Sequence, residues 1–103
     1  MDASTVYIEN FPNEMTNEDM AKVFKRAGII RHISMPTFKD KQPKGFCFIE
    51  YGSLEQAESA CRLFNNCVPE EFTNSACENY IQFKNNTQAI TQLRVMLKAE
   101  WTT

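Results

Sequence analysis

Residues 44–51 decide the fold, and they read Lys44-Gly45-Phe46-Cys47-Phe48-Ile49-Glu50-Tyr51. In a β-strand, successive side chains point to opposite faces. One face therefore carries the apolar set Cys47, Ile49 and Tyr51, as expected of a strand that faces a core. The other face carries two neighbouring phenylalanines together with Lys44 and Glu50. A core would not contain that combination, so the second face calls for another explanation.

The same eight residues fit the octamer signature of RNA recognition motifs, K/R-G-F/Y-G/A-F-V-x-F/Y. Ile49 stands in the Val position, and Cys47 is the one departure. Earlier in the chain, residues 5–11 are β-branched and aromatic and are ended by Pro12, which predicts a strand. They fit the companion motif of that family, aliphatic-aromatic-aliphatic-x-Asn-apolar, with Tyr7 in the aromatic position.

Length and charge set limits on the kind of protein. A chain of 103 residues has the size of one domain. The net charge of −2 argues against nucleic-acid binding through bulk electrostatics alone. The charge is unevenly distributed, however, because residues 22–44 hold seven bases and one acid. These bases are Lys22, Lys25, Arg26, Arg31, Lys39, Lys41 and Lys44. A solvated helix face explains the first three, but not Arg31 or the 39–44 loop.

Cysteine, histidine and hydropathy patterns exclude several classes. The four cysteines form no C-x-x-C pair and His32 is the single histidine, so we expect neither a metal site nor a cofactor. Cys47 and Cys61 fall at core positions, which indicates reduced thiols in an intracellular compartment. No apolar run is long enough for a membrane span, and no signal peptide opens the chain.

Two helices and two further strands are predicted around the octamer. Thr16 and Asp19 form a capping box that begins a helix, and Gly28 is expected at its C′ position. Ser53 and Gln56 form a second such box. Residues 29–36 read as a strand in which Ile30, Ile33 and Met35 face the core, with a bulge because the first two break alternation. The apolar stripes of the helices are Met20, Val23, Phe24 and Ala27, and Ala57, Ala60, Cys61 and Phe64.

The end of the chain supplies the fourth strand. Residues 93–97 alternate, with Leu93, Val95 and Leu97 inward and Arg94, Met96 and Lys98 outward. The preceding residues 65–91 read as an irregular insertion with a short helix after Pro69 and a short strand over 80–83. The order βαββαβ predicts an α+β, ferredoxin-like fold: a four-stranded antiparallel sheet backed by two helices, in one domain over residues 4–101.

Such a sheet leaves one face uncovered by the two helices. The exposed rings could stabilise neighbouring strands, or lie under a further helix, or stack on unpaired bases while cations neutralise phosphates. Three aromatics with nearby cations exceed what strand pairing needs, so we expect a single-stranded RNA site, weakened by Glu9 and Glu50. Its predicted residues are Tyr7, Lys44, Phe46, Phe48, Arg94 and Met96, with Arg31 and His32 on the second strand.

The two motifs identify the chain as resembling an RNA recognition motif domain over essentially its whole length. Residues 5–12, 33–36, 43–46 and 93–95 are also similar to the first such domain of La and La-related proteins. The group-7 branch, which includes an RNA chaperone of a small-nuclear ribonucleoprotein and the ciliate telomerase La-family subunit, is most similar.

This resemblance implies a nuclear protein of a noncoding ribonucleoprotein. In that family the domain follows a winged-helix La motif, and the pair grips the 3′ oligouridine end of the RNA. By resemblance, His32 and Ile33 would help hold a uridine between the two domains. Tight recognition of the 3′ end is therefore expected to need the neighbouring La motif.

Two other functions compete with RNA binding. The same fold could dock protein partners as a scaffold in a ribonucleoprotein, with little RNA binding of its own. A small enzyme on this scaffold would need a loop that cradles phosphate, but residues 11–14 after the first strand offer no glycine and no cation. We therefore predict that the domain is not an enzyme.

Overall fold

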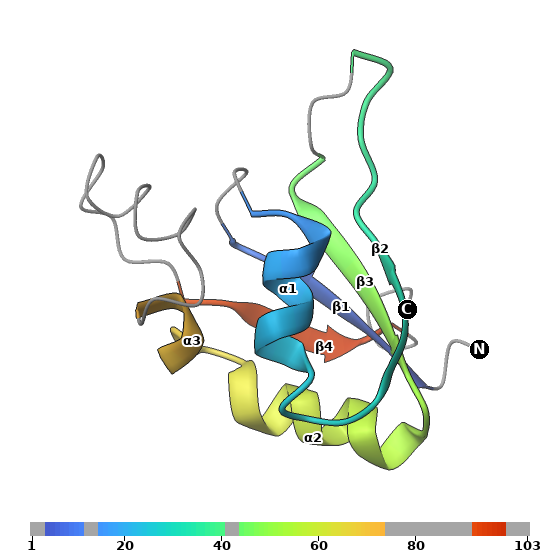
Figure 1. Ribbon diagram of the computed structural model, residues 1–103, viewed down its shortest axis with the longest axis vertical. Helices are drawn as coiled ribbons and strands as arrows, with labels where there is room; N and C mark the ends of the chain where they lie inside the picture. The colour runs from blue at the N-terminus through green and yellow to red at the C-terminus, as the bar shows by residue number, and fades with distance from the viewer. Residues whose placement is uncertain (1–3, 12–14, 41–43, 74–91, 99–103) are drawn as a thin grey trace.

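A computed structural model describes residues 4–11, 15–40, 44–73 and 92–98. Seven elements follow one another along the chain (Figure 1). They are β1 (Thr5–Glu9), α1 (Asn17–Phe24), β2 (Ile30–Ser34), β3 (Phe46–Tyr51), α2 (Leu54–Phe64), α3 (Glu70–Thr73) and β4 (Arg94–Leu97). The short helix α3 confirms the helix predicted after Pro69, whereas the strand predicted over 80–83 lies outside the described residues.

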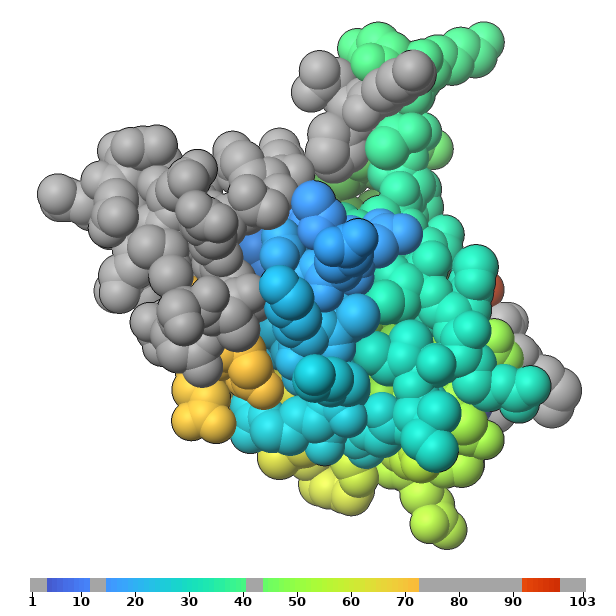
Figure 2. Space-filling view, in the orientation of Figure 1, coloured from blue at the N-terminus to red at the C-terminus, as the bar shows by residue number. Residues whose placement is uncertain are grey.

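The four strands form one antiparallel sheet in the order β2-β3-β1-β4. Both long helices lie on the same side of this sheet, where α1 contacts β2 and α2 contacts β1, β3 and β4 (Figure 1). Figure 2 shows that helical side, with α1 across its middle. The predicted α+β, ferredoxin-like βαββαβ arrangement is confirmed, and α3 is an addition that contacts α1.

The core lies between the helices and the inner face of the sheet. Strand alternation holds as predicted, since Val6, Ile8, Cys47, Ile49 and Tyr51 are fully buried. The predicted helix stripes supply the other layer, with Met20, Val23, Phe24, Ala57, Ala60 and Phe64 all at 0% exposure. Phe24 and Phe64 place their ring centroids 4.6 Å apart, so the two helices meet through aromatic packing.

Helix α1 begins as predicted but ends earlier. Thr16 Oγ1 accepts from the Asp19 N–H at 3.2 Å, and Asp19 Oδ2 accepts from the Thr16 N–H at 3.1 Å, completing the capping box. The helix stops at Phe24, with Lys25 as its C-cap. Tight turns then bond each N–H to the carbonyl three residues back through Gly28. Gly28 is therefore not the C′ residue.

Gly28 is needed because α2 approaches it closely. A Cβ at Gly28 would lie 2.6 Å from the Gln56 side chain. Ser53 caps α2 as predicted, with its Oγ accepting from the Gln56 N–H at 3.2 Å. Gln56 does not complete a capping box, because its Oε1 accepts from the Gly52 N–H at 3.0 Å and the Ile29 N–H at 3.2 Å. This one amide joins the turn before β2 to the turn after β3.

The second strand carries the predicted bulge. The register of β2 against β3 shifts between Ile30 and His32, so Ile30 and Ile33 both turn toward the core. At the start of β3, Gly45 has a φ of 92°, and the space beside it is open. The glycine of the octamer is thus required by backbone conformation, which disfavours any residue with a Cβ.

Strand β4 is tied to the rest of the chain by two asparagine side chains. Asn65, at the end of α2, accepts from the Val95 N–H at 3.0 Å. Asn10 has a φ of 70°, and its Nδ2 donates to the Gln92 carbonyl at 2.6 Å. The asparagine of the companion motif therefore ends β1 and holds the approach to β4.

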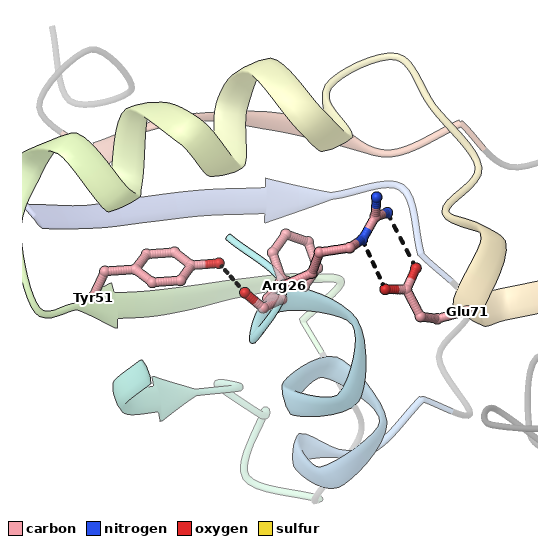
Figure 3. Close-up of polar contacts among 4 residues, drawn as sticks. Arg26, Tyr51 and Glu71 are labelled. Carbon is pink, nitrogen blue, oxygen red and sulfur yellow. Dashed lines mark hydrogen bonds and ion pairs between the residues drawn. The ribbon is translucent and has the colours of Figure 1, made fainter. Parts of the chain in front are cut away.

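Polar contacts hold the end of α1 and the turn after it (Figure 3). The Tyr51 hydroxyl donates to the Phe24 carbonyl at 2.8 Å, which joins the core face of the octamer to the end of α1. Arg26 makes two contacts with Glu71 of α3, at 2.9 and 3.2 Å, and lies 4.9 Å from the centroid of the Phe64 ring. Arg26, one of the seven bases between residues 22 and 44, therefore stabilises the packing of the helices through its ion pair with Glu71.

Candidate nucleic-acid interface

Three aromatic rings gather on the sheet face opposite α1 and α2. Tyr7 on β1 lies across from Phe48 on β3, and Phe46 precedes Phe48 on the same face. The ring centroids lie 5.6 Å apart for Tyr7 and Phe46, 5.7 Å for Tyr7 and Phe48, and 5.5 Å for the two phenylalanines. Every ring contacts both others, whereas the octamer and the companion motif predicted only that the three rings share this face. We call this set the aromatic triad.

The triad is less open than the sequence suggested. Tyr7 is only 6% exposed, whereas Phe46 and Phe48 are half-buried. Both phenylalanine rings pack against Tyr7, and the Tyr7 hydroxyl donates to Glu9 Oε2 at 3.0 Å. The central ring therefore supports the outer two, and the accessible aromatic surface belongs to Phe46 and Phe48.

Strand β4 brings cations to the edge of the triad. Arg94 lies opposite Glu9, and its Nε is 3.5 Å from Glu9 Oε1. Met96 lies opposite Tyr7 and is half-buried. Lys98 Nζ lies 5.1 Å from the centroid of the Phe48 ring, a cation–π distance. A ligand that stacks on Phe48 would meet this ammonium group.

The octamer lysine, Lys44, lies at the end of the loop that precedes β3. Lys44 Nζ is 5.5 Å from the centroid of Phe38, and the Lys44 N–H donates to the Pro36 carbonyl at 3.0 Å. Phe38 is 57% exposed. It was not among the predicted site residues, although an aromatic residue inside a basic loop is the signal that could have identified it.

Strand β2 forms one edge of the sheet, and it carries the remaining predicted site residues, Arg31, His32 and Ile33. Arg31 and His32 are exposed, and Ile33 is half-buried against the core. Together with Ile30 and three α1 residues they line a hollow of about 420 Å³. The α1 residues are Asn17, Glu18 and Ala21. Most of the site predicted from sequence thus lies on two surfaces, the outer sheet face with the triad and the hollow at the β2 edge, while Lys44 lies beside Phe38 in the loop before β3.

The described residues give few options for metal or thiol chemistry. In residues 4–11, 15–40, 44–73 and 92–98, no three His, Cys, Asp or Glu side chains come together as metal ligands. Burial raises the pKa of the Cys47 thiol to about 12, so this thiol stays protonated and unreactive at neutral pH. Within the same part of the chain, no helix is long and apolar enough to cross a bilayer.

A family model described as RNA recognition motif matches residues 6–72, from within β1 to within α3. The chain belongs to the RNA recognition motif family. This domain type binds RNA and is not a kind of enzyme, and it typically stacks bases on the aromatics of its two strand motifs. The aromatic residues of these two strand motifs correspond in this chain to Tyr7, Phe46 and Phe48 on the outer sheet face.

Curated relatives extend the similarity. The chain is 40% identical over 72 residues to La-related protein 7 of Xenopus tropicalis, covering 69% of this chain and 12% of that protein. It is 40% identical over 65 residues to nuclear cap-binding protein subunit 2 of Drosophila ananassae, covering 62% of this chain and 42% of that protein. The chain thus spans about one eighth of the length of the first relative.

Solved structures share the fold. One, titled as a Sxl-lethal protein/RNA complex, has a TM-score of 0.69 at 22% identity over 92% of this chain and 47% of that chain. Another, the Rna15 RNA recognition motif with bound RNA (GU), has a TM-score of 0.63 at 20% identity over 90% of this chain and 80% of that chain. At these identities the likeness concerns the fold alone.

Proposed function

We propose that this chain is the RNA-binding module of a La-related protein, a single domain over residues 4–101. It binds single-stranded RNA through the outer sheet face. The observation that carries the proposal is the pair of half-buried rings, Phe46 and Phe48, which pack against Tyr7. Each base stacked on an aromatic ring contributes about 1–3 kcal/mol. Arg94 and Lys98 stand beside the rings, where they neutralise phosphates.

The finer proposal concerns the 3′ end of the RNA. At the shallow hollow of the β2 edge, Arg31 faces a phosphate and His32 and Ile33 contact a uracil. An adjacent La motif closes this site over the uridine-rich end. The identity to La-related protein 7 supports this assignment, as it supports a nuclear noncoding ribonucleoprotein, with telomerase RNA as one such target.

A second candidate function is a scaffold that binds protein subunits of a ribonucleoprotein and little RNA. The specific observations in its favour are the 6% exposure of Tyr7 and the Lys98 ammonium over the Phe48 ring. Both reduce the aromatic surface that a base can reach. A scaffold would keep these contacts in the presence of RNA, whereas an RNA-binding domain would exchange them for bases.

The test is an NMR titration of the full chain with oligouridine and with mixed-sequence single strands. We expect shifts at Phe46, Phe48 and His32. The double variant Phe46→Ala and Phe48→Ala should lose at least about tenfold in affinity, because it removes two stacking surfaces. Arg31→Gln should lose a few-fold, since it removes one phosphate contact.

Arg62→Gln is the matched control for Arg31→Gln, because it makes the same charge change on the exposed side of α2. Equal losses from these two variants would mean that the RNA senses only net charge. Loss in Arg31→Gln with full binding by the double phenylalanine variant would move the RNA from the sheet to the β2 edge. The absence of any shift with every RNA would favour the scaffold.

A further inference from the structure

One row across the outer sheet face combines an aromatic ring, a carboxylate and a guanidinium. Phe46 on β3 lies opposite Glu9 on β1, and Glu9 lies opposite Arg94 on β4. Neighbouring strands are about 4.8 Å apart. A base stacked on Phe46 therefore has its edge within reach of Glu9. This position matters because stacking itself accepts any base, whereas hydrogen bonds at the edge distinguish them.

Glu9 is held in one orientation but keeps acceptor capacity. Its Oε2 accepts from the Tyr7 hydroxyl at 3.0 Å, and its Oε1 lies 3.5 Å from Arg94 Nε. A carboxylate has about four lone-pair sites and no donor, so both oxygens can accept further hydrogen bonds. The side chains of Arg94 and Glu9 are 62% and 37% exposed, and a pair this exposed is weak enough to exchange for a ligand.

We infer that Glu9 selects guanine as the base stacked on Phe46. This inference rests on the proposed function, because it needs a base on that ring. Guanine presents two adjacent donors, N1–H and N2–H, which match the two oxygens of one carboxylate. Adenine and cytosine each present one amino group. Uracil presents a single N3–H between two carbonyl oxygens, and these repel the carboxylate.

The arrangement also assigns a role to Arg94 during binding. When guanine donates to the Glu9 carboxylate, its O6 acceptor lies next to those donors. The Arg94 guanidinium, released from its 3.5 Å contact, has donors for O6 or for a neighbouring phosphate. Tyr7 acts as the positioning residue, since its hydroxyl orients the carboxylate and its ring supports Phe46.

Selection of guanine at the sheet means that the two surfaces of the proposed site bind different bases. A uridine-rich end is disfavoured beside Glu9 and is therefore held at the β2 edge by Arg31, His32 and Ile33. The triad then takes a guanine elsewhere in the same RNA. Glu9, which reads in the sequence only as a charge that repels phosphate, becomes a determinant of specificity.

The test uses the full chain and four pentanucleotide RNAs that carry guanine, adenine, cytosine or uracil at the centre of a uridine background. Dissociation constants and shifts at Phe46 and Phe48 are measured by NMR titration. The wild type should bind the guanine RNA about tenfold more tightly than the all-uridine RNA, as expected for a two-donor contact. The adenine and cytosine RNAs should fall between them.

Glu9→Gln should abolish the preference for guanine. An amide offers one acceptor and one donor, which pair equally well with the N3–H and O4 of uracil and with the N1–H and O6 of guanine, so the two-donor advantage of guanine is lost. Glu50→Gln is the matched control, because it removes the same charge from the same face in the row of Thr5 and His32. It should raise all four affinities alike and preserve their order.

The possible failures are distinct. If all four RNAs shift Phe46 and Phe48 but bind the wild type equally, or if Glu9→Gln keeps the wild-type order, the inference is wrong and the proposed RNA binding stands. If no RNA shifts these rings, sheet binding is wrong and the inference falls with it. A merely structural role of Glu9 predicts weaker binding of every RNA in Glu9→Gln, with no change of order.

Discussion

The two faces of β3 both carry large apolar side chains, but they differ in burial. Cys47, Ile49 and Tyr51 on the inner face are at 0% exposure under α1 and α2. On the outer face, Phe46, Phe48 and Glu50 are half-buried, and no described helix covers them. The inner face is sealed by other elements, whereas the outer rings cover one another and Tyr7. The first arrangement supports stability, and the second leaves surface for a ligand.

The largest expected difference between the faces is chemical. A thiol with a pKa of about 12 is thiolate in about one molecule in ten thousand at pH 8, so native Cys47 should resist iodoacetamide. In urea its pKa returns toward 9, and alkylation should accelerate about a thousandfold. Mass spectrometry after timed labelling measures this, with the exposed Cys67 as an internal check on the reagent. Rapid labelling of native Cys47 would show that the inner face opens.

A related consequence concerns pH. Because folding raises the pKa of Cys47, the thiol contributes stability below about pH 9, and this contribution is lost as the pH rises toward 12. Burial also raises the pKa of Tyr51, which acts in the same direction at still higher pH. Ionisation of Cys47 and Tyr51, both on the inner face of β3, should therefore destabilise the fold at alkaline pH.

The next effect compares one truncation on each face. Ile49→Ala should lower the free energy of unfolding by about 3 kcal/mol, because it leaves a cavity in the sealed core. Phe46→Ala should cost about 1 kcal/mol, since it removes ring contacts on the outer face without making a closed cavity. Urea denaturation followed by circular dichroism measures both. Equal costs would mean that the outer rings form a second core.

The smallest effect compares the two tyrosine hydroxyls. Tyr51→Phe should cost about 1–2 kcal/mol, because the buried Phe24 carbonyl loses its donor at 2.8 Å. Tyr7→Phe removes a hydrogen bond to a partly exposed carboxylate and should cost about 0.5 kcal/mol. Urea denaturation measures both changes in the free energy of unfolding. A larger loss of stability for Tyr7→Phe than for Tyr51→Phe would contradict the greater contribution expected of the inner face.

Local patterns predicted much of this molecule. The alternation in residues 44–51, the Thr16 capping box and the β2 bulge were all foreseen, because each depends on neighbours within a few residues. The end of α1 was not foreseen. Gly28 suggested a C′ glycine, but its real constraint is Gln56 from another helix. Contacts between elements leave no trace in the local spacing of a sequence.

The candidate site divides in the same way. The sequence identified the rings of the triad but did not predict that Tyr7 is buried. From the sequence, Glu9 was expected only to repel phosphate. Nor did the sequence single out Phe38 or the position of Lys98 over Phe48. Each of these depends on where another strand or loop lies, and the order of strands decides that.

By itself, the sequence determined the alternation of the strands, the starts of both long helices, and that two aromatic motifs share a face. Periodicity and capping are short-range, so they can be read along the chain. Only the tertiary structure decided that β2 is an edge and that Phe46, Glu9 and Arg94 form one row. Strand pairing brings together residues far apart in sequence, and a carboxylate becomes a selective contact only when its neighbours orient it.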